Sequence, residues 1–252
     1  MVLELDKNDL PTYRPWGEVG WAVIILALSI LIGLGIAAGT FFLSLEMGGG
    51  AWAGSSAFAD VFSIIPTQIS CIWMVTIRAR RVGGGNLVHG LAAGPIPRSR
   101  VFIGALAFEL VGTAYALIRV LVQPEYAYAF RNHLFGPLVA AYRAGPILAT
   151  GYLILLTLLA PVSEELFFRG WLWTALRPSW GIWPTALFTG GVWWISHAYY
   201  EPRALHFLLL TAVILSLVRH HTGSVRAAII IHILENARFV LMQTVMLLIL
   251  QR

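Results

Sequence analysis

The stretch VGWAVIILALSILIGLGIAAGTFFLS at residues 19–44 decides the fold class, because it contains no charged side chain. An α-helix of about 20 apolar residues is long enough to cross the ~30 Å hydrocarbon core of a bilayer. We therefore predict that this segment spans a membrane. The charged residues Glu4, Asp6, Lys7 and Asp9 precede it, which is the wrong order for a cleaved secretory signal, so the segment is expected to stay in the mature protein.

Composition extends this prediction to the whole chain. Hydrophobic residues make up 58% of it and charged residues 12%, whereas roughly a quarter of the residues of a soluble protein are charged. A net charge of +5 on a membrane protein is typical of basic cytoplasmic loops, so we expect a lipid bilayer and no nucleic acid as partner. The single cysteine, Cys71, excludes an internal disulfide and argues against a thiolate metal site.

Apolar runs separated by glycine, proline and arginine predict an all-α polytopic helix bundle with about seven transmembrane spans, in a range of roughly six to eight. We expect residues 1–252 to form a single integral membrane domain, with its catalytic half at about 147–249. The predicted spans are residues 19–44, 57–77, 101–122, 147–172, 182–200, 204–219 and 225–249.

The arginines predict the orientation of these spans. The first connection, residues 46–56, has no lysine or arginine, while five arginines crowd the second: Arg78, Arg80, Arg81, Arg98 and Arg100. Because cytoplasmic loops carry the excess of basic residues, we predict that the second connection is cytoplasmic. The N-terminus, Arg177 and the 219–226 loop then also lie inside, and the 123–146 loop, with Arg131 and Arg143, lies outside.

Charged residues interrupt the fourth span, which reads LLAPVSEELFFR at residues 158–169. An ionised side chain at the centre of a spanning helix costs about 2.5–3.5 kcal/mol, so it indicates partners or function. Glu165 and Arg169 are four residues apart and can pair, whereas Glu164 points about 100° away and has no local counter-ion. A carboxylate in a dry site beside a like charge gains proton affinity, as a general base or acid needs. The alternative is a charged helix end at a break marked by Pro161 and Ser163.

Two histidines lie in the later spans. His197 follows the run WWIS, and His232 lies inside an apolar helix one turn before Asn236. His232 and Asn236 face the same way, and two such donors suit a developing oxyanion. Taken singly, a histidine in a membrane helix usually makes an ordinary hydrogen bond between helices, but the two histidines together with the glutamate pair favour a functional site.

In order and spacing, these residues resemble the CPBP family, the CAAX-processing and bacteriocin-processing intramembrane endopeptidases also called the Abi family, which includes the type II CAAX prenyl endopeptidase. The resemblance covers residues 150–240, and residues 222–225 also read like the start of the family's last signature. Trp193 stands where the family generally has phenylalanine, and we expect the larger ring to alter packing or the cleft more than the chemistry. The motifs that carry the resemblance are Glu164-Glu165-x-x-x-Arg169, His197 and His232-x-x-x-Asn236.

What the resemblance implies is an intramembrane peptidase that uses a glutamate and a histidine to hydrolyse a peptide bond near the membrane interface. We expect no cofactor, because the chain has no HExxH motif. Its partner would be a peptide or protein substrate, with a prenylated CaaX-type C-terminus as one candidate. The implied roles are water activation by Glu164 with His197, oxyanion stabilisation by His232 and Asn236, and support of the site by Glu165 and Arg169.

Three other interpretations remain open. Glu164, His197 and His232 could bind zinc with water as the fourth ligand, although the chain has no HExxH motif. The same buried groups could serve a transporter or proton-coupled carrier, although the sequence shows no inverted repeat. A non-proteolytic scaffold or immunity protein of the same family is the third. The sequence assigns no role to Glu235, and a structural role comes first for Glu109 and Arg119.

The predicted span edges place the motif residues at different depths in the membrane, which conflicts with their forming one site. At about 1.5 Å per residue, the predicted span edges put Glu164 about 26 Å from the outer face and His197 about 22 Å from the inner face. His232 falls between them, about 10 Å from the inner face. We therefore expect that some helix edges differ from the predicted ones, or that a segment is tilted or broken.

Overall fold

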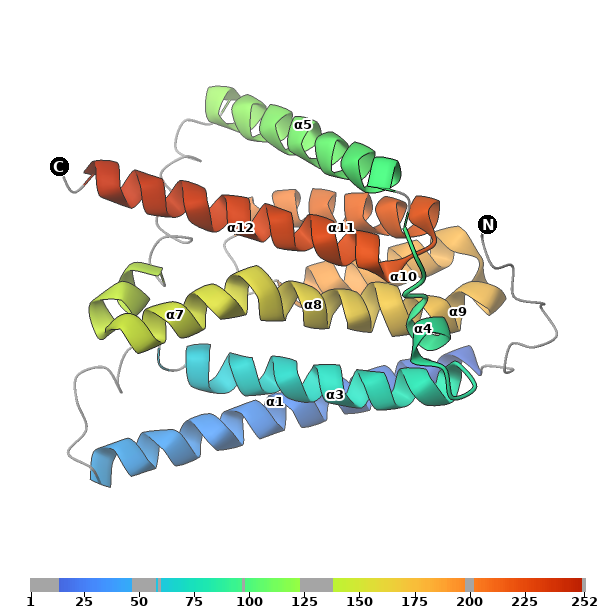
Figure 1. Ribbon diagram of the computed structural model, residues 1–252, viewed down its shortest axis with the longest axis horizontal. Helices are drawn as coiled ribbons and strands as arrows, with labels where there is room; N and C mark the ends of the chain where they lie inside the picture. Colours follow the sequence, from blue (N-terminus) through green and yellow to red (C-terminus); the bar gives the residue numbers. More distant parts are fainter. Residues whose placement is uncertain are drawn as a thin grey trace.

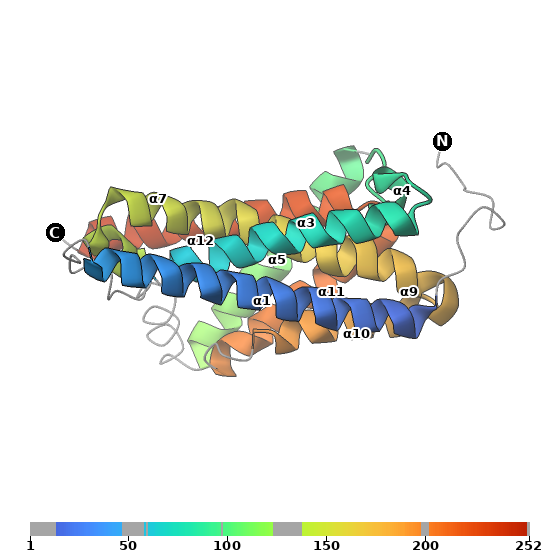
Figure 2. The same ribbon diagram turned by 90° about the horizontal axis from the view of Figure 1, so that it is seen from below.

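The computed structural model describes residues 14–46, 58, 60–96, 98–122, 138–197 and 202–250. These residues form helices and short connections without a strand, which confirms the predicted all-α class. Figure 1 shows the long helices running side by side along one axis. The start of α1 and the end of α12 lie at opposite ends of this bundle (Figures 1 and 2).

Each of the seven predicted spans corresponds to a helical stretch. The first span is α1 (Pro15–Glu46). The second consists of the π-helical turn η1 (Asp60–Ile64) and α3 (Ile65–Val82), and the third is α5 (Arg98–Val122). The short helix α4 (Leu87–Leu91) lies in the second connection. The last three are α10 (Ile182–Ile195), α11 (Pro202–Thr222) and α12 (Val225–Leu250).

The fourth predicted span is one long helical rod that changes its winding. It consists of α7 (Pro146–Ile154), η2 (Leu155–Leu159), α8 (Ala160–Glu165), η3 (Leu166–Leu172) and α9 (Trp173–Trp180). The two η segments are π-helical, so their backbone bonds reach five residues back instead of four. In Figure 1 this rod runs through the middle of the molecule.

Five helices in the described residues are long and apolar enough to cross a membrane: Pro15–Glu46, Val61–Val82, Arg98–Arg119, Pro146–Trp180 and Leu205–Thr222. The other two predicted spans fall outside this set. With 14 residues, α10 is only about 21 Å long, which is short of a full crossing. The helix α12 has 26 residues but carries charged side chains at Arg226, Glu235 and Arg238. The chain is an integral membrane protein, with fewer unambiguous spans than its apolar runs predicted.

The helices pack around the central rod. Helix α1 packs on α3, which in turn contacts α8 and η3, while α12 contacts η2 and α8, and α10 packs on α11. Gly33 allows the close α1–α3 contact, because a side chain there would collide with the Ser63 carbonyl and the Thr67 hydroxyl. The largest buried side chains come from the rod and α10, and include Trp171, Trp173, Trp193 and Arg169.

The depth conflict disappears in the structure. The rod turns into α10 at Gly181, whose φ of 78° requires glycine. Glu164 lies 16 residues before Trp180 and His197 lies 15 residues after Ile182, so both are about 22–24 Å from the same turn. The start of α12 lies beside Gly170, because a side-chain carbon on Gly170 would be 3.5 Å from Val225. Gly170 is about 15 Å along the rod from Trp180, and His232 is a further ~10 Å along α12. His232 therefore lies at about the same distance from the turn as Glu164 and His197.

The arginine-rich segments gather at one end of the bundle. The end of α3, α4, the start of α5, the end of α9 and the α11–α12 turn all lie on the right in Figure 1. Arg143 lies just before α7, at the opposite end, and Arg131 lies outside the described residues. The structure therefore places the arginine-rich connections at one end of the bundle, as the orientation prediction requires. Which side of the membrane this end faces stays a prediction.

Candidate active site

A change of winding in the rod sets the position of the two glutamates. Pro161 has no N–H group, so it cannot close the backbone bond expected at this point of the helix. The preceding residues wind as a π-helix, with the Ala160 N–H donating to the Leu155 carbonyl. A second π-helical segment follows Glu165 directly. The short α8 that carries Glu164 and Glu165 is thus held between two wide turns, a feature often found at functional sites.

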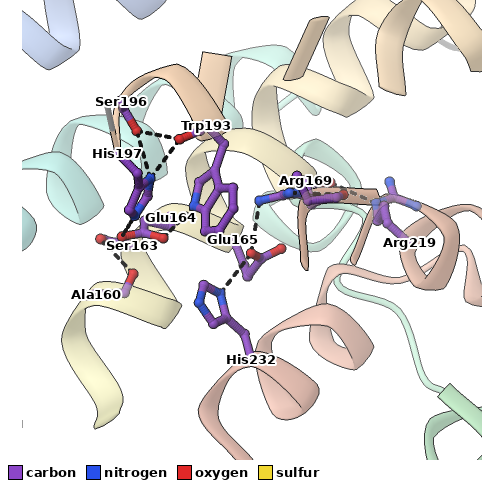
Figure 3. Close-up of polar contacts among 11 residues, drawn as sticks. Ala160, Ser163, Glu164, Glu165, Arg169, Trp193, Ser196, His197, Arg219 and His232 are labelled. Carbon is purple, nitrogen blue, oxygen red and sulfur yellow. Dashed lines mark hydrogen bonds and ion pairs between the residues drawn. The ribbon is translucent and has the colours of Figure 1, made fainter. Parts of the chain in front are cut away.

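Glu164 faces the end of α10. Its Oε2 accepts a 2.5 Å hydrogen bond from the indole Nε1 of Trp193. Its Oε1 lies 4.0 Å from Nε2 of His197, and the two side chains are 18% and 14% exposed. Glu164 and His197 are therefore paired in a site that is largely shielded but still reachable (Figure 3).

The orientation of His197 is fixed by the last turn of α10. Its Nδ1 lies 2.7 Å from the backbone carbonyl of Trp193 and 3.2 Å from the hydroxyl of Ser196. A carbonyl can only accept, so Nδ1 carries a proton and donates it to Trp193. This contact assigns the neutral imidazole's lone pair to Nε2, the atom that faces Glu164.

Glu165 belongs to a separate and fully buried network. Its Oε1 accepts hydrogen bonds from Arg169 Nη1 at 3.1 Å and from His232 Nδ1 at 3.0 Å. The side chains of Glu165 and Arg169 are 0% exposed. The predicted pairing of Glu165 with Arg169 is thus present, and it also fixes the imidazole of His232 from the neighbouring helix α12.

Arg169 is itself held by α11. Its Nη2 donates to the Ala212 carbonyl at 3.4 Å, and its own carbonyl accepts from Arg219 Nε at 2.7 Å. The sequence placed Arg219 in a cytoplasmic loop, and this was wrong for its side chain, which is buried and also donates to Thr174. The reason is that α11 extends to Thr222, so Arg219 still lies on the helix and faces the rod.

Asn236 contacts the break in the rod. Its Nδ2 donates a 2.8 Å hydrogen bond to the Leu156 carbonyl. In a π-helix this carbonyl would accept a bond from the backbone N–H five residues later, at position 161. Proline has no N–H, so Pro161 cannot make that bond. The amide of Asn236 therefore replaces a missing backbone donor and ties α12 to the segment that carries Glu164.

The comparison with protein families agrees with the motifs. Residues 146–238 match the family model described as type II CAAX prenyl endopeptidase Rce1-like. We call residues 146–238 the Rce1-like segment, after the family model that they match. The match contains all six candidate residues and nearly coincides with the 150–240 resemblance, which is thereby confirmed. No curated protein and no solved structure matches the chain.

The Rce1-like segment implies a peptidase of the CAAX-type intramembrane class, which acts on peptide or protein substrates at a membrane. Its polar residues come from the rod, α10 and α12, and Figure 3 shows them converging from these three elements. In that view the indole of Trp193 stands between the Glu164–His197 pair and the network of Glu165. The larger ring also brings an indole N–H, which donates directly to Glu164.

Other polar contacts around the Rce1-like segment were not predicted. Ser163 donates to the side chain of Gln68 on α3, outside the matched residues. Gln68 interrupts an apolar span, so the criterion that identified Glu164 could also have found it. At the arginine-rich end, Glu18 is buried and accepts from Arg78 and from Trp171 Nε1. This second cluster holds α1 and α3 against the rod.

The unassigned acids belong to the outer contact between α5 and α12. Arg238 pairs with Glu109 at 2.9 Å and with Glu235 at 2.7 Å. Glu109 and Arg238 are 42% and 36% exposed in their side chains, so this cluster is separate from the buried site. The structure thus gives Glu109 and Glu235 a shared partner in Arg238, and a structural role for Glu109 stays a prediction.

The residues do not form an evident metal site. Among the residues that the structure describes, no three His, Cys, Asp or Glu side chains are arranged to hold a metal ion. The zinc interpretation needs Glu164, His197 and His232 together, and Nε2 is the ring nitrogen of His232 that the Nδ1 bond to Glu165 leaves for such a role. These three side chains are not grouped as a metal site in the described part of the chain, and a cofactor-free site stays a prediction.

Proposed function

We propose that the protein is a glutamate-dependent intramembrane endopeptidase in which Glu164 and His197 activate a water molecule. The observation that carries this proposal is the facing of Glu164 Oε1 and His197 Nε2 at 4.0 Å. This gap is too long for a direct hydrogen bond, but a water can bond to both atoms at about 2.8 Å each. Such a water can lose a proton to the pair as it attacks a peptide carbonyl.

His232 and Asn236 are the proposed oxyanion donors. The amide of Asn236 has two N–H groups, and the Leu156 carbonyl uses one of them. Nδ1 of His232 is bonded to Glu165, so only Nε2 is available for a substrate. The donor that His232 contributes to the oxyanion is therefore an N–H at Nε2, and the bond from Nδ1 to Glu165 holds the ring in place. Hydrogen-bond donors aimed at the developing negative charge are typically the largest single contribution to transition-state stabilisation in acyl transfer.

A peptide with a prenylated CaaX-type C-terminus is the proposed substrate. The matched family is described by that activity, and a prenyl chain partitions into the lipid that surrounds the helices. Cleavage is tested by incubating the purified protein with a prenylated CaaX peptide and identifying the released C-terminal tripeptide by mass spectrometry. The same peptide without its prenyl group is the control, and we expect it to be cleaved more slowly.

Chelation separates this mechanism from a metal-dependent one. We expect wild-type cleavage to be unchanged in the presence of a strong chelator, because the proposed water-activating groups are a carboxylate and an imidazole. The measurement is the initial rate of peptide cleavage with and without the chelator. If the rate falls and added zinc restores it, the glutamate mechanism must be replaced by a metal mechanism.

We further propose that the arginine-rich end of the bundle is cytoplasmic, as the excess of basic residues there favours. Arg80 and Arg143 are both exposed and lie at opposite ends. In a Cys71→Ala background, we expect Arg143→Cys to react with a membrane-impermeant maleimide in intact cells. Arg80→Cys should react only after the membrane is opened. The reverse pattern would invert the orientation.

A further inference from the structure

Trp193 contacts four residues of the proposed site: Glu164, His197, His232 and Arg169. It is 1% exposed, its indole N–H donates to Glu164, and its backbone carbonyl accepts from His197 Nδ1. Its ring centroid lies 4.4 Å from the ring of His197 and 5.9 Å from that of His232. The guanidinium carbon of Arg169 lies 5.2 Å from the same ring. Figure 3 shows the indole at the centre of these side chains.

We propose that Trp193 is a positioning residue that orients both members of the water-activating pair, a role that rests on the proposed peptidase function. The side chain sets Glu164 and the backbone carbonyl sets His197, so a single residue fixes their relative placement. Both contacts are made to the two residues proposed to activate the water, so the proposed role of Trp193 is exerted through Glu164 and His197.

The physical reason lies in the freedom of a carboxylate. The terminal torsion of a glutamate is broad, so an unrestrained carboxylate can present either oxygen over a wide range of angles. A charge-assisted hydrogen bond of 2.5 Å on Oε2 restricts this rotation and leaves Oε1 toward His197. Reactions of this kind are sensitive to small misplacements, because the reacting groups must be held near the attack geometry.

Phenylalanine at position 193 fills a similar space but has no N–H to donate to Glu164. A simpler explanation is that a buried tryptophan has merely found a hydrogen-bond acceptor, as most do. The two explanations differ in what removal of the N–H does to turnover.

Trp194 provides a matched control. It follows Trp193 on α10, is half-buried, and donates its indole N–H to the Leu205 carbonyl at 2.8 Å, away from Glu164. Replacing either tryptophan with phenylalanine removes one indole N–H and part of one ring from the same helix. Only the change at Trp193 removes a contact with the proposed site.

We expect Trp193→Phe to lower kcat by about tenfold to a hundredfold, the range for a hydrogen bond to a charged group, with KM changed less than about twofold. We expect Trp194→Phe to leave kcat within about twofold of wild type, since a purely structural loss lowers the amount of folded protein and not its turnover. The measurement is steady-state cleavage of the prenylated peptide, corrected for folded protein. An unchanged kcat in Trp193→Phe, or equal losses in both variants, would overturn the proposal.

A double-mutant cycle tests the same contact without any cleavage. We expect Trp193→Phe to lower the melting temperature by a few degrees in the wild-type background, about 2–4 °C per kcal/mol for a chain of this size. In a Glu164→Ala background the same change should have a much smaller effect, because the acceptor is already gone. If the protein cleaves no peptide but the effect of Trp193→Phe is smaller in the Glu164→Ala background, the peptidase function is contradicted and the Trp193–Glu164 contact is not. Equal effects in both backgrounds contradict the role of Trp193 as well.

Discussion

Glu164→Ala is expected to abolish cleavage of a prenylated CaaX peptide, with kcat reduced by at least about a thousandfold. The variant removes the carboxylate that faces His197 across 4.0 Å, and no other carboxylate takes its place, because Glu165 is held by Arg169 and His232. Steady-state kinetics, corrected for the amount of folded protein, is the measurement. Full activity in this variant would remove the basis of the proposed mechanism.

His197→Ala tests the other member of the pair. We expect a loss similar to that of Glu164→Ala, and little further loss when both changes are combined, because residues that act as a unit are not additive. Glu109→Ala is the control, since Glu109 lies on α5, is 42% exposed and contacts Arg238 instead of the buried site. Independent, multiplying losses at positions 164 and 197 would show that the two residues do not act on one water.

Arg169→Ala is expected to cause the largest loss of stability of any single change considered, about 3–5 kcal/mol. It leaves the carboxylate of Glu165 fully buried, with His232 as its one remaining hydrogen-bond partner among the residues that the structure describes. It also removes the donor to the Ala212 carbonyl and empties a large space beside Trp193. Thermal unfolding in detergent measures the effect, and a variant as stable as wild type would show that the ion pair is dispensable for folding.

A double replacement separates the buried charge from the lost volume. Glu165→Leu combined with Arg169→Met removes both charges and keeps most of the apolar volume, so we expect most of the stability to return. Glu165→Leu on its own should be destabilising, because the guanidinium then remains buried without a carboxylate. If the double variant is as unstable as Arg169→Ala, the loss comes from the hydrogen bonds to α11 and α12 rather than from the uncompensated charge.

The Rce1-like site could be predicted in outline because its residues are exceptions in apolar helices. Glu164, Glu165 and Arg169 stood out for their charge, and helical spacing alone indicated that Glu165 pairs with Arg169. The partners of Glu164 could not be predicted in this way. Spacing along one helix says nothing about which neighbouring helix is closest, so the indole of Trp193 and the contact from Gln68 to Ser163 were not evident.

The predicted helix edges failed where winding and length depart from a regular span. Pro161 and the π-helical segments beside it were visible only as a break, and the rod that contains them runs 35 residues from Pro146 to Trp180. The rod continues about ten residues beyond the point where α12 begins. Counting residues from assumed membrane faces therefore gave inconsistent depths for Glu164, His197 and His232. For the same reason, Arg219 was assigned to a loop although its side chain is buried against the rod.

The sequence by itself determined that the chain is an all-α membrane protein, because transfer of apolar surface out of water depends on composition and on run length. It also determined which polar residues need an explanation. Only the tertiary structure decided how they divide, with Glu164 joined to Trp193 and His197, and Glu165 joined to Arg169 and His232. The physical reason is that hydrogen bonds depend on distances of a few tenths of an ångström, which the relative positions of separate helices set and local sequence does not.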